Sequence, residues 1–169
     1  MLTKPEYDWE CIDFLVNEGP AFLFHDDKIF ITYSASGTGV PYAVGLLTAD
    51  RGSDLMDPKS WTKSPVPVFK TCSANGQYGP GHNSFTKSED DSEDLMIYHA
   101  RNYTEIKGDP LFDPNRHARV GVVRWNEDGT PGFGVPEPDN LWTPVTTDVL
   151  PPDGGPKAGT PAVGLAAEA

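Results

Sequence analysis

Short apolar runs separated by turn-forming residues are the main pattern in the first part of this chain. Ala21–Phe24 is apolar, Asp26-Asp27 forms a turn, and Lys28–Ser34 is rich in β-branched and aromatic residues. A third run, Tyr42–Thr48, follows the turn-forming stretch Ser36-Gly37-Thr38-Gly39. No segment keeps a helical period over the length that a helix requires, so the pattern predicts antiparallel strands.

Further strands are expected on both sides of this group. Asp57–Trp61 contains Pro and Ser and predicts a turn that leads into a short outer strand. Val66–Phe69 predicts another strand after it. Residues 1–16 mix aromatic, charged and apolar side chains without a period, and we expect an extended lead-in there.

The pattern repeats later in the chain. Glu18 and His82 lie 64 positions apart (from 18 to 82), and Tyr33 and Tyr98 lie 65 apart (from 33 to 98). The aligned segments of the second unit share the apolar and turn residues of the first: Gly81–Phe85, the acidic turn Glu89–Asp94, Leu95–His99 and Val120–Trp125. An insertion of roughly ten residues within Arg101–Arg116 lengthens the second unit.

A repeat of about four strands is typical of a β-propeller blade. Propellers close with about four to eight blades, and residues 1–136 hold about two. The sequence therefore predicts an all-β fold, a partial propeller of two antiparallel four-stranded sheets. On this alignment Glu18 and His82 occupy equivalent places, and both should point toward one shared axis.

The last part of the chain has a different character. Residues 137–169 contain six prolines, and the final stretch is rich in Gly, Ala and Pro. This composition predicts a largely disordered tail. Residues 141–150 are the one stretch there with an apolar content that could pair as an edge strand.

Charge and length exclude some classes of partner. The chain has 169 residues and a formal net charge of −12, with the acidic residues spread along it. Nucleic acid and anionic membranes attract basic patches, so neither is an expected partner. No apolar run approaches the roughly 20 residues of a membrane span, and no export signal is visible near Met1. The localisation is left open.

The two cysteines carry little information. Cys11 and Cys72 could pair or stay free, and a count of two does not fix the compartment. Neither has a second Cys or His at a spacing typical of zinc sites.

Three residues are candidates for chemistry. Glu18 lies in a turn-forming context and could be a turn cap or a general acid. His82 could be satisfied by backbone carbonyls or face the channel axis. Arg119 could be a solvated charge at a strand edge, or it could pair with a carboxylate through its planar guanidinium.

The motifs, taken together and in order, resemble glycoside hydrolase family 43, and most of all its exo-acting α-L-arabinofuranosidases. The resemblance covers about residues 5–136. It is carried by five segments: Asn17–Pro20, Lys28–Ser36, Gly45–Thr48, Tyr78–Phe85 and Asp113–Val120.

The resemblance implies a five-bladed β-propeller and hydrolysis with inversion by three carboxylates. It implies that Glu18 is the acid, that His82 helps to hold a hydrated calcium or similar ion at the channel centre, and that Arg119 lies near the sugar. Arg116 and His117 flank Arg119 and could be confused with it. The implied base and the aspartate that tunes the acid belong to earlier blades, which this chain lacks.

The leading hypothesis is the C-terminal part of an arabinofuranosidase-like propeller with the acid but not the base. An isolated chain of this kind should be nearly inactive, and it should need a missing N-terminal half or associate with itself. The alternative is a noncatalytic carbohydrate-binding or scaffold protein. The expected partner is an arabinose-containing polysaccharide or oligosaccharide, although the sequence does not distinguish arabinose from xylose. Trp9 could stack on a sugar, but packing is the expected role of Trp9, Trp61 and Trp125.

Overall fold

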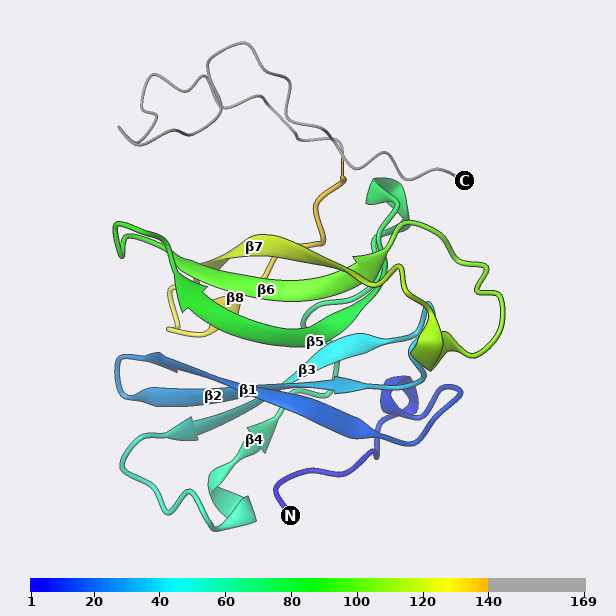
Figure 1. The fold of residues 1–169 in the computed structure, drawn as a ribbon. Helices are drawn as coiled ribbons and strands as arrows, with labels where there is room; N and C mark the ends of the chain where they lie inside the picture. Colours follow the sequence, from blue (N-terminus) through cyan, green and yellow to red (C-terminus); the bar gives the residue numbers. More distant parts are fainter. Residues whose placement is uncertain (140–169) are drawn as a thin grey trace, which may run out of the picture. The chain divides into compact units, whose positions relative to one another are not determined.

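The computed structural model describes residues 1–139, and the predicted tail lies almost entirely outside the described residues, as does the edge strand expected at 141–150. Two four-stranded antiparallel sheets make up the fold (Figure 1). The first sheet has the order β1-β2-β3-β4 and the second β5-β6-β7-β8. The strands are β1 (Asn17–His25), β2 (Lys28–Ala35), β3 (Ala43–Asp50), β4 (Thr62–Lys63), β5 (Tyr78–Lys87), β6 (Asp94–Arg101), β7 (His117–Trp125) and β8 (Pro131–Gly132). The prediction of two units of about four strands is confirmed.

Turn chemistry explains most strand boundaries. β1 and β2 form a hairpin closed at His25 and Lys28, and Asp26 adopts a φ of 49° in the turn between them. Aspartate tolerates this left-handed conformation better than most side chains do. The insertion expected within Arg101–Arg116 forms the long connection between β6 and β7.

One predicted strand was wrong. Val66–Phe69 is not a strand, although Phe69 makes a single bridge to Val44. Pro65 and Pro67 lack the backbone N–H groups that a ladder requires, and this limits the outer strand β4 to Thr62–Lys63.

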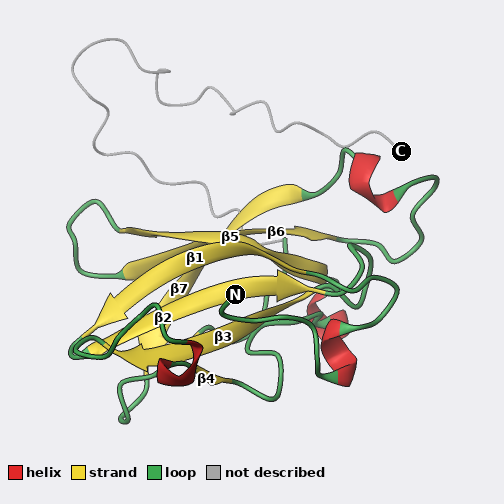
Figure 2. Ribbon diagram, turned by 90° about the horizontal axis from the view of Figure 1, so that it is seen from below, coloured by secondary structure: helices red, strands yellow, loops and turns green. Residues whose placement is uncertain are grey.

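Helical structure among residues 1–139 consists of four 3₁₀ turns of three residues each (Figure 2): η1 (Asp8–Glu10), η2 (Pro58–Ser60), η3 (Ser73–Asn75) and η4 (Pro110–Phe112). The lead-in is thus not extended throughout, since η1 forms within it. The backbone N–H of Tyr7 donates to the carboxylate of Glu10 at 2.9 Å, and the N–H of Glu10 donates to the carbonyl of Tyr7 at 2.8 Å, which closes η1.

The main core lies between the two sheets. Its buried members come from both: Leu23, Phe30, Val44, Leu46, Phe69, Met96, Tyr98, Ala100, Val123 and Phe133. Phe69 meets Tyr98 edge to face at 4.8 Å, and His25 stacks on Trp125 at 3.7 Å between ring centroids. Aromatic pairs of this kind add to the burial of apolar area.

A second cluster covers the other face of the first sheet. Trp9 and Trp61 pack there against the buried residues Ile31, Tyr33, Ala35 and Leu47. The Trp9 indole donates a hydrogen bond to the carbonyl of Pro65, and the Trp61 indole donates one to that of Leu55. Together with Trp125 in the main core, these contacts confirm the packing role expected for the three tryptophans.

Candidate functional site

Two β-bulges build the candidate site: the bulge of β1 between Glu18 and Ala21, and the second of two irregularities in β5, between Gly81 and Ser84. Glu18 pairs with Ser34 and Ala21 with Thr32, so Gly19 and Pro20 of β1 face the single residue Tyr33. In β5, Gly81 pairs with His99 and Ser84 with Ile97, so that two residues again face one tyrosine. A bulge re-aims the side chains beside it.

The register corrects the alignment that the sequence suggested. Glu18 pairs with the residue that follows Tyr33, and Gly81 pairs with the residue that follows Tyr98. Tyr33 and Tyr98 are the equivalent tyrosines of the two repeats. Gly81, not His82, therefore occupies the place of Glu18, and His82 occupies that of Gly19. The backbone agrees, because φ is 59° at Gly19 and 49° at His82.

Glu18 and His82 still meet. Nδ1 of His82 lies 3.2 Å from Oε2 of Glu18, with 34% of the Glu18 side chain and 56% of the His82 side chain exposed. The hydroxyl of Tyr42 donates a hydrogen bond to Oε1 of Glu18. The Glu18 carboxylate therefore has a partner at each oxygen and is still accessible to solvent. A glutamate that only caps a turn would need neither the two side-chain partners nor the exposure.

Two glycines make room for the aromatic rings around Glu18. A Cβ on Gly81 would lie 2.3 Å from Cε1 of Tyr42, and a Cβ on Gly19 would lie 3.1 Å from Nδ1 of His82. The absence of a side chain at Gly19 therefore leaves space for the ring of His82, and its absence at Gly81 leaves space for the ring of Tyr42.

Tyr42 is fully buried, and its ring stacks on His99 with 5.6 Å between centroids. Burial, with the hydrogen bond to Glu18 adding to it, raises the pKa of Tyr42 well above its usual value, so the phenol remains a donor. Burial also lowers the pKa of His99 to about 4, and the positive charge of Arg116 contributes. His99 is therefore neutral at pH 7. Its two ring nitrogens are buried and have no hydrogen-bond partner within the described residues.

Sequence reasoning missed Tyr42 and His99. The pattern of apolar residues predicts only that Tyr42 begins one strand and that His99 ends another. No local motif marks them, because their roles depend on which residues the other sheet places beside them. A hint was available for Tyr42, since it follows a turn-rich segment that ends in Pro41 and so had to lie at a sheet end.

Arg119 is engaged away from Glu18. Its Nε and Nη2 donate to the two carboxylate oxygens of Asp139 at 2.9 and 2.8 Å, and Nη1 donates to the carbonyl of Ala100. Burial raises the pKa of Asp139, but hydrogen bonds from Arg119 outweigh this, and the net result is a pKa below the usual value. Arg116 is the neighbour whose charge influences both Tyr42 and His99.

An ion site is not complete within residues 1–139. No group of three or more His, Cys, Asp or Glu side chains converges there. His82 with Glu18 offers one nitrogen and one carboxylate, whereas a calcium ion prefers six to eight oxygen ligands. The described side chains alone therefore do not fit an ion at this point. The sequence left the pairing of the cysteines open; Cys11 and Cys72 are both free.

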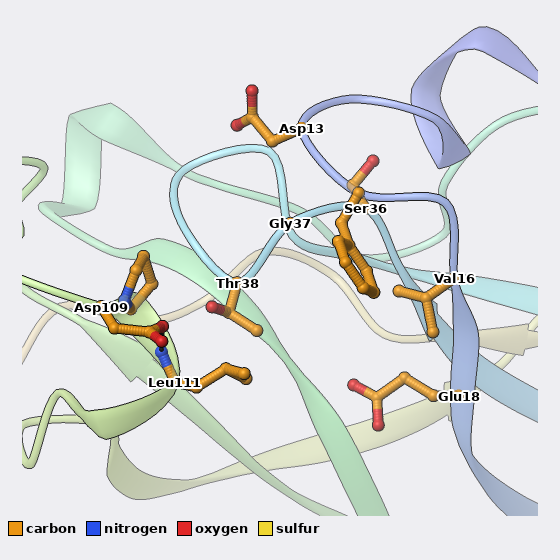
Figure 3. A pocket seen from close by; sticks show the side chains of 10 residues that line it. Asp13, Val16, Glu18, Ser36, Gly37, Thr38, Asp109 and Leu111 are labelled. Atoms are coloured by element: carbon orange, nitrogen blue, oxygen red, sulfur yellow. Dashed lines mark hydrogen bonds between the residues drawn. The ribbon is translucent and has the colours of Figure 1, made fainter.

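Glu18 borders two hollows. A pocket of about 480 Å³ lies on one side, where Thr38, Asp109 and Leu111 face it (Figure 3). A smaller hollow of about 250 Å³ lies on the outer face of the first sheet and includes Phe22 and Tyr33. Among residues 1–139, no helix is long and apolar enough to cross a membrane.

Known proteins define the class of this fold. A solved α-L-arabinofuranosidase from Lactobacillus brevis superimposes with a TM-score of 0.81 at 58% identity, and the match covers 83% of this chain and 43% of that one. An endo-1,4-β-xylanase from Bacteroides thetaiotaomicron matches with a TM-score of 0.62 at 25% identity over 78% of this chain and 42% of that one. The two sheets are thus blades of a glycosidase-type β-propeller.

The family follows from the sequence comparison. The model for glycosyl hydrolases family 43 matches residues 1–131, and the chain belongs to this family. An extracellular exo-α-(1→5)-L-arabinofuranosidase of Streptomyces avermitilis is 55% identical over 144 residues, which are 85% of this chain and 30% of that protein. The α-L-arabinofuranosidase 43 of Humicola insolens is 51% identical, with the same two shares. The chain thus spans about a third of the length of these relatives.

Proposed function

We propose that this chain supplies the general acid, Glu18, of an inverting exo-α-L-arabinofuranosidase. The observation that carries the proposal is the Glu18 carboxylate, held at both oxygens by Tyr42 and His82 and bordering an open pocket. The 55% identity to an exo-acting arabinofuranosidase supports the substrate class. Like that relative, the protein would act on arabinose-containing polysaccharide or oligosaccharide outside the cell.

The proposed step moves two protons in opposite directions. Glu18 gives its proton to the glycosidic oxygen as the bond from that oxygen to the anomeric carbon breaks. A water molecule attacks the anomeric carbon from the other face and loses a proton to a carboxylate base. Acid and base carboxyls of inverting enzymes stand roughly 6.5–9.5 Å apart to leave room for this water.

The base is proposed to come from blades that this chain does not cover. Asp8 and Asp13 are close to Glu18 in sequence, but they match no base motif and are not assigned. Blades of the kind found in the longer relatives would pack on the first sheet, where Phe22 and Phe24 of β1 are 57% and 55% exposed. An exposed apolar pair on a strand edge favours such a contact, or self-association in its absence.

The remaining roles are proposals of the same kind. His82 would orient Glu18 and contact a central ion through water, with further ligands from outside residues 1–139. Arg119 would bind a sugar hydroxyl near Glu18 only after its hydrogen bonds to Asp139 break. Its present partners make Arg119 the least direct of the three candidates.

Complementation tests the proposal. The purified chain, alone and mixed with a separately made N-terminal half of the Lactobacillus brevis enzyme, is assayed for release of the aryl group from an aryl α-L-arabinofuranoside. We expect almost no turnover alone, because general-base help is worth about 10²–10⁴-fold and positioning of the water is lost as well. Turnover of the mixture should vanish with Glu18→Gln and persist with Glu89→Gln, a change in an exposed turn.

Two results would contradict the proposal. A turnover of about 1 s⁻¹ or more by the chain alone, within the ordinary enzyme range, would show that it contains a base. Restored turnover that survives Glu18→Gln would show that Glu18 is not the acid.

A further inference from the structure

The pocket beside Glu18 has three walls from distant parts of the chain. The lead-in contributes Phe14 and Val16, the turn after β2 contributes residues 36–38, and the long connection between β6 and β7 contributes Asp109–Leu111 (Figure 3). The third wall belongs to the insertion that distinguishes the second repeat from the first. The pocket has a volume of about 480 Å³, which falls in the range of small-molecule sites.

Hydrogen bonds fix the first two walls to each other. The backbone N–H of Gly37 donates to the carbonyl of Ile12 at 2.8 Å. The hydroxyl of Ser36 donates to the carbonyl of Trp9 at 2.6 Å and accepts from the N–H of Ile12. This edge of the pocket is therefore formed before any ligand arrives.

A buried arginine fixes the third wall. Arg101 is 1% exposed and donates to the carbonyl of Thr38 on one side and to that of Pro110, at 2.9 Å, on the other. Its charge is balanced by Asp113 at 3.0 Å. A buried guanidinium with all these partners holds the two loops at a set separation, which is the preorganisation that a binding site requires.

The lining is mostly apolar and carries a few oxygen atoms, a combination that suits the C–H faces and the hydroxyls of a sugar ring. Glu18, Thr38 and Asp109 contribute oxygen atoms to the lining, whereas the carboxylate of Asp13 points away from the other labelled side chains (Figure 3). No lysine, arginine or histidine lines it, so an anionic ligand would lack a counter-charge. The apolar surfaces of Phe14, Val16 and Leu111 suit the C–H faces of a sugar ring.

We propose that this pocket binds the leaving-group sugar of the substrate, the pentose unit next to the bond that is cleaved. The inference rests on the proposed function, because a general acid must reach the oxygen between the two sugars. Glu18 also lines the pocket, so a sugar bound there places its linking oxygen within reach of the acid. Asp109 and Thr38 bind the hydroxyls, and Leu111 covers one face of the ring.

The test measures binding, which does not depend on catalysis. The full chain, labelled with ¹⁵N, is titrated with α-1,5-linked arabinobiose and followed by amide chemical shifts. We expect weak, about millimolar, binding with shifts concentrated at residues 36–38 and 109–111. Glucuronic acid, an anionic sugar about as large as one unit of the disaccharide, should leave these amides unchanged.

Matched variants separate the pocket from its surroundings. Leu111→Ala should weaken binding about three- to tenfold, whereas Phe112→Ala, which removes a more exposed neighbour outside the lining, should not. Asp109→Asn should weaken it similarly. Its control is Asp57→Asn, because Asp57 also precedes a proline and caps a 3₁₀ turn but lies away from the pocket.

The outcomes distinguish this inference from the proposed function. Shifts at other residues, or equal affinities for Leu111→Ala and Phe112→Ala, would overturn the pocket assignment even if the complemented enzyme is active. Binding at the pocket that the variants weaken as stated would support it even if complementation fails. Arg101→Lys should reduce binding while the chain still melts cooperatively; unchanged affinity would overturn the role of Arg101 in holding the third wall.

Discussion

The bulge of β1 at Gly19-Pro20 and the bulge of β5 at His82-Asn83 share a pairing pattern and a positive φ at their first residue, but the side chains at the two places differ. The first places a carboxylate and then a glycine, Glu18-Gly19, where the second places a glycine and then an imidazole, Gly81-His82. The His82 ring lies over Gly19, and the Tyr42 ring lies over Gly81. The bulge of β1 thus orients the carboxylate of Glu18, and the bulge of β5 orients the imidazole of His82 beside it.

The supports of the two bulges differ as well. The first is backed by the buried carboxylate of Glu10, which accepts a hydrogen bond from Asn17 at 3.2 Å. The second is anchored on the first sheet: the N–H of His82 donates to Ser34 at 2.7 Å, and the amide of Asn83 donates to Thr32 at 2.9 Å. The comparison teaches that the second half of the site depends on the first sheet, whereas the first half is held by its own lead-in.

The largest expected effect comes from the support of the first bulge. Glu10 is fully buried and accepts from Lys63 at 2.8 Å and from the Tyr33 hydroxyl at 2.8 Å. Glu10→Gln should lower the free energy of unfolding by about 3–5 kcal/mol, because it leaves the Lys63 ammonium without its buried partner. Urea unfolding measures it.

The control uses the same lysine. Glu6 lies 3.3 Å from Lys63 and is 49% exposed, and Glu6→Gln should cost less than about 1 kcal/mol. Equal losses for the two variants would mean that the lead-in does not hold the first bulge as described.

The next effect tests the space that the second bulge leaves for Tyr42. Gly81→Ala should cost about 1–3 kcal/mol or more, because its Cβ would collide with the buried Tyr42 ring. Gly52→Ala is the control, since nothing lies within 4 Å of a Cβ there. If Gly81→Ala melts at the same temperature as Gly52→Ala, the reciprocal packing of rings on glycines is wrong.

The pH dependence tests the ring behind Tyr42. The pKa of His99 is lowered to about 4 in the fold, against 6.5 for the free side chain. Its contribution to stability is therefore fully present above about pH 6.5, and it is lost as the pH falls toward 4, since only the unfolded chain takes up the proton. Between pH 7.5 and 5 the loss amounts to about 2 kcal/mol.

Variants isolate the His99 contribution from that of the carboxylates. His99→Gln should remove about 2 kcal/mol of the difference in unfolding free energy between these two pH values, whereas His117→Gln, an exposed change on β7, should not. The same pH dependence in His99→Gln and in the parent chain would contradict the assignment.

The smallest expected effect concerns the hydroxyl that holds Glu18. Tyr42→Phe keeps the ring over Gly81 and removes only the hydrogen bond, so it should cost about 1 kcal/mol. In the complemented enzyme it should lower turnover more than it raises KM, because it loosens the acid rather than the sugar. Tyr78→Phe, whose hydroxyl makes no hydrogen bond with residues 1–139, is the control; a matching loss of turnover there would remove the role given to Tyr42.

The sequence determined the strands, the two-sheet repeat and the insertion. Alternating apolar runs and turn residues are local signals, and a strand such as Lys28–Ala35 depends mainly on them. Motif order also determined the family, which the comparisons confirmed. The strand expected at Val66–Phe69 failed for a local reason as well, since Pro65 and Pro67 were visible in the sequence.

Only the tertiary structure decided the register of the second bulge and the partners of Glu18. A shift of one residue leaves the composition of Gly81-His82-Asn83 unchanged, so the alignment with Glu18 could not reveal it. Tyr42 and His99 acquire their roles from contacts across more than twenty positions of the chain, and so does Arg101 through its hydrogen bond to the carbonyl of Thr38. Such contacts depend on how two sheets pack, and no periodicity within either sheet encodes them.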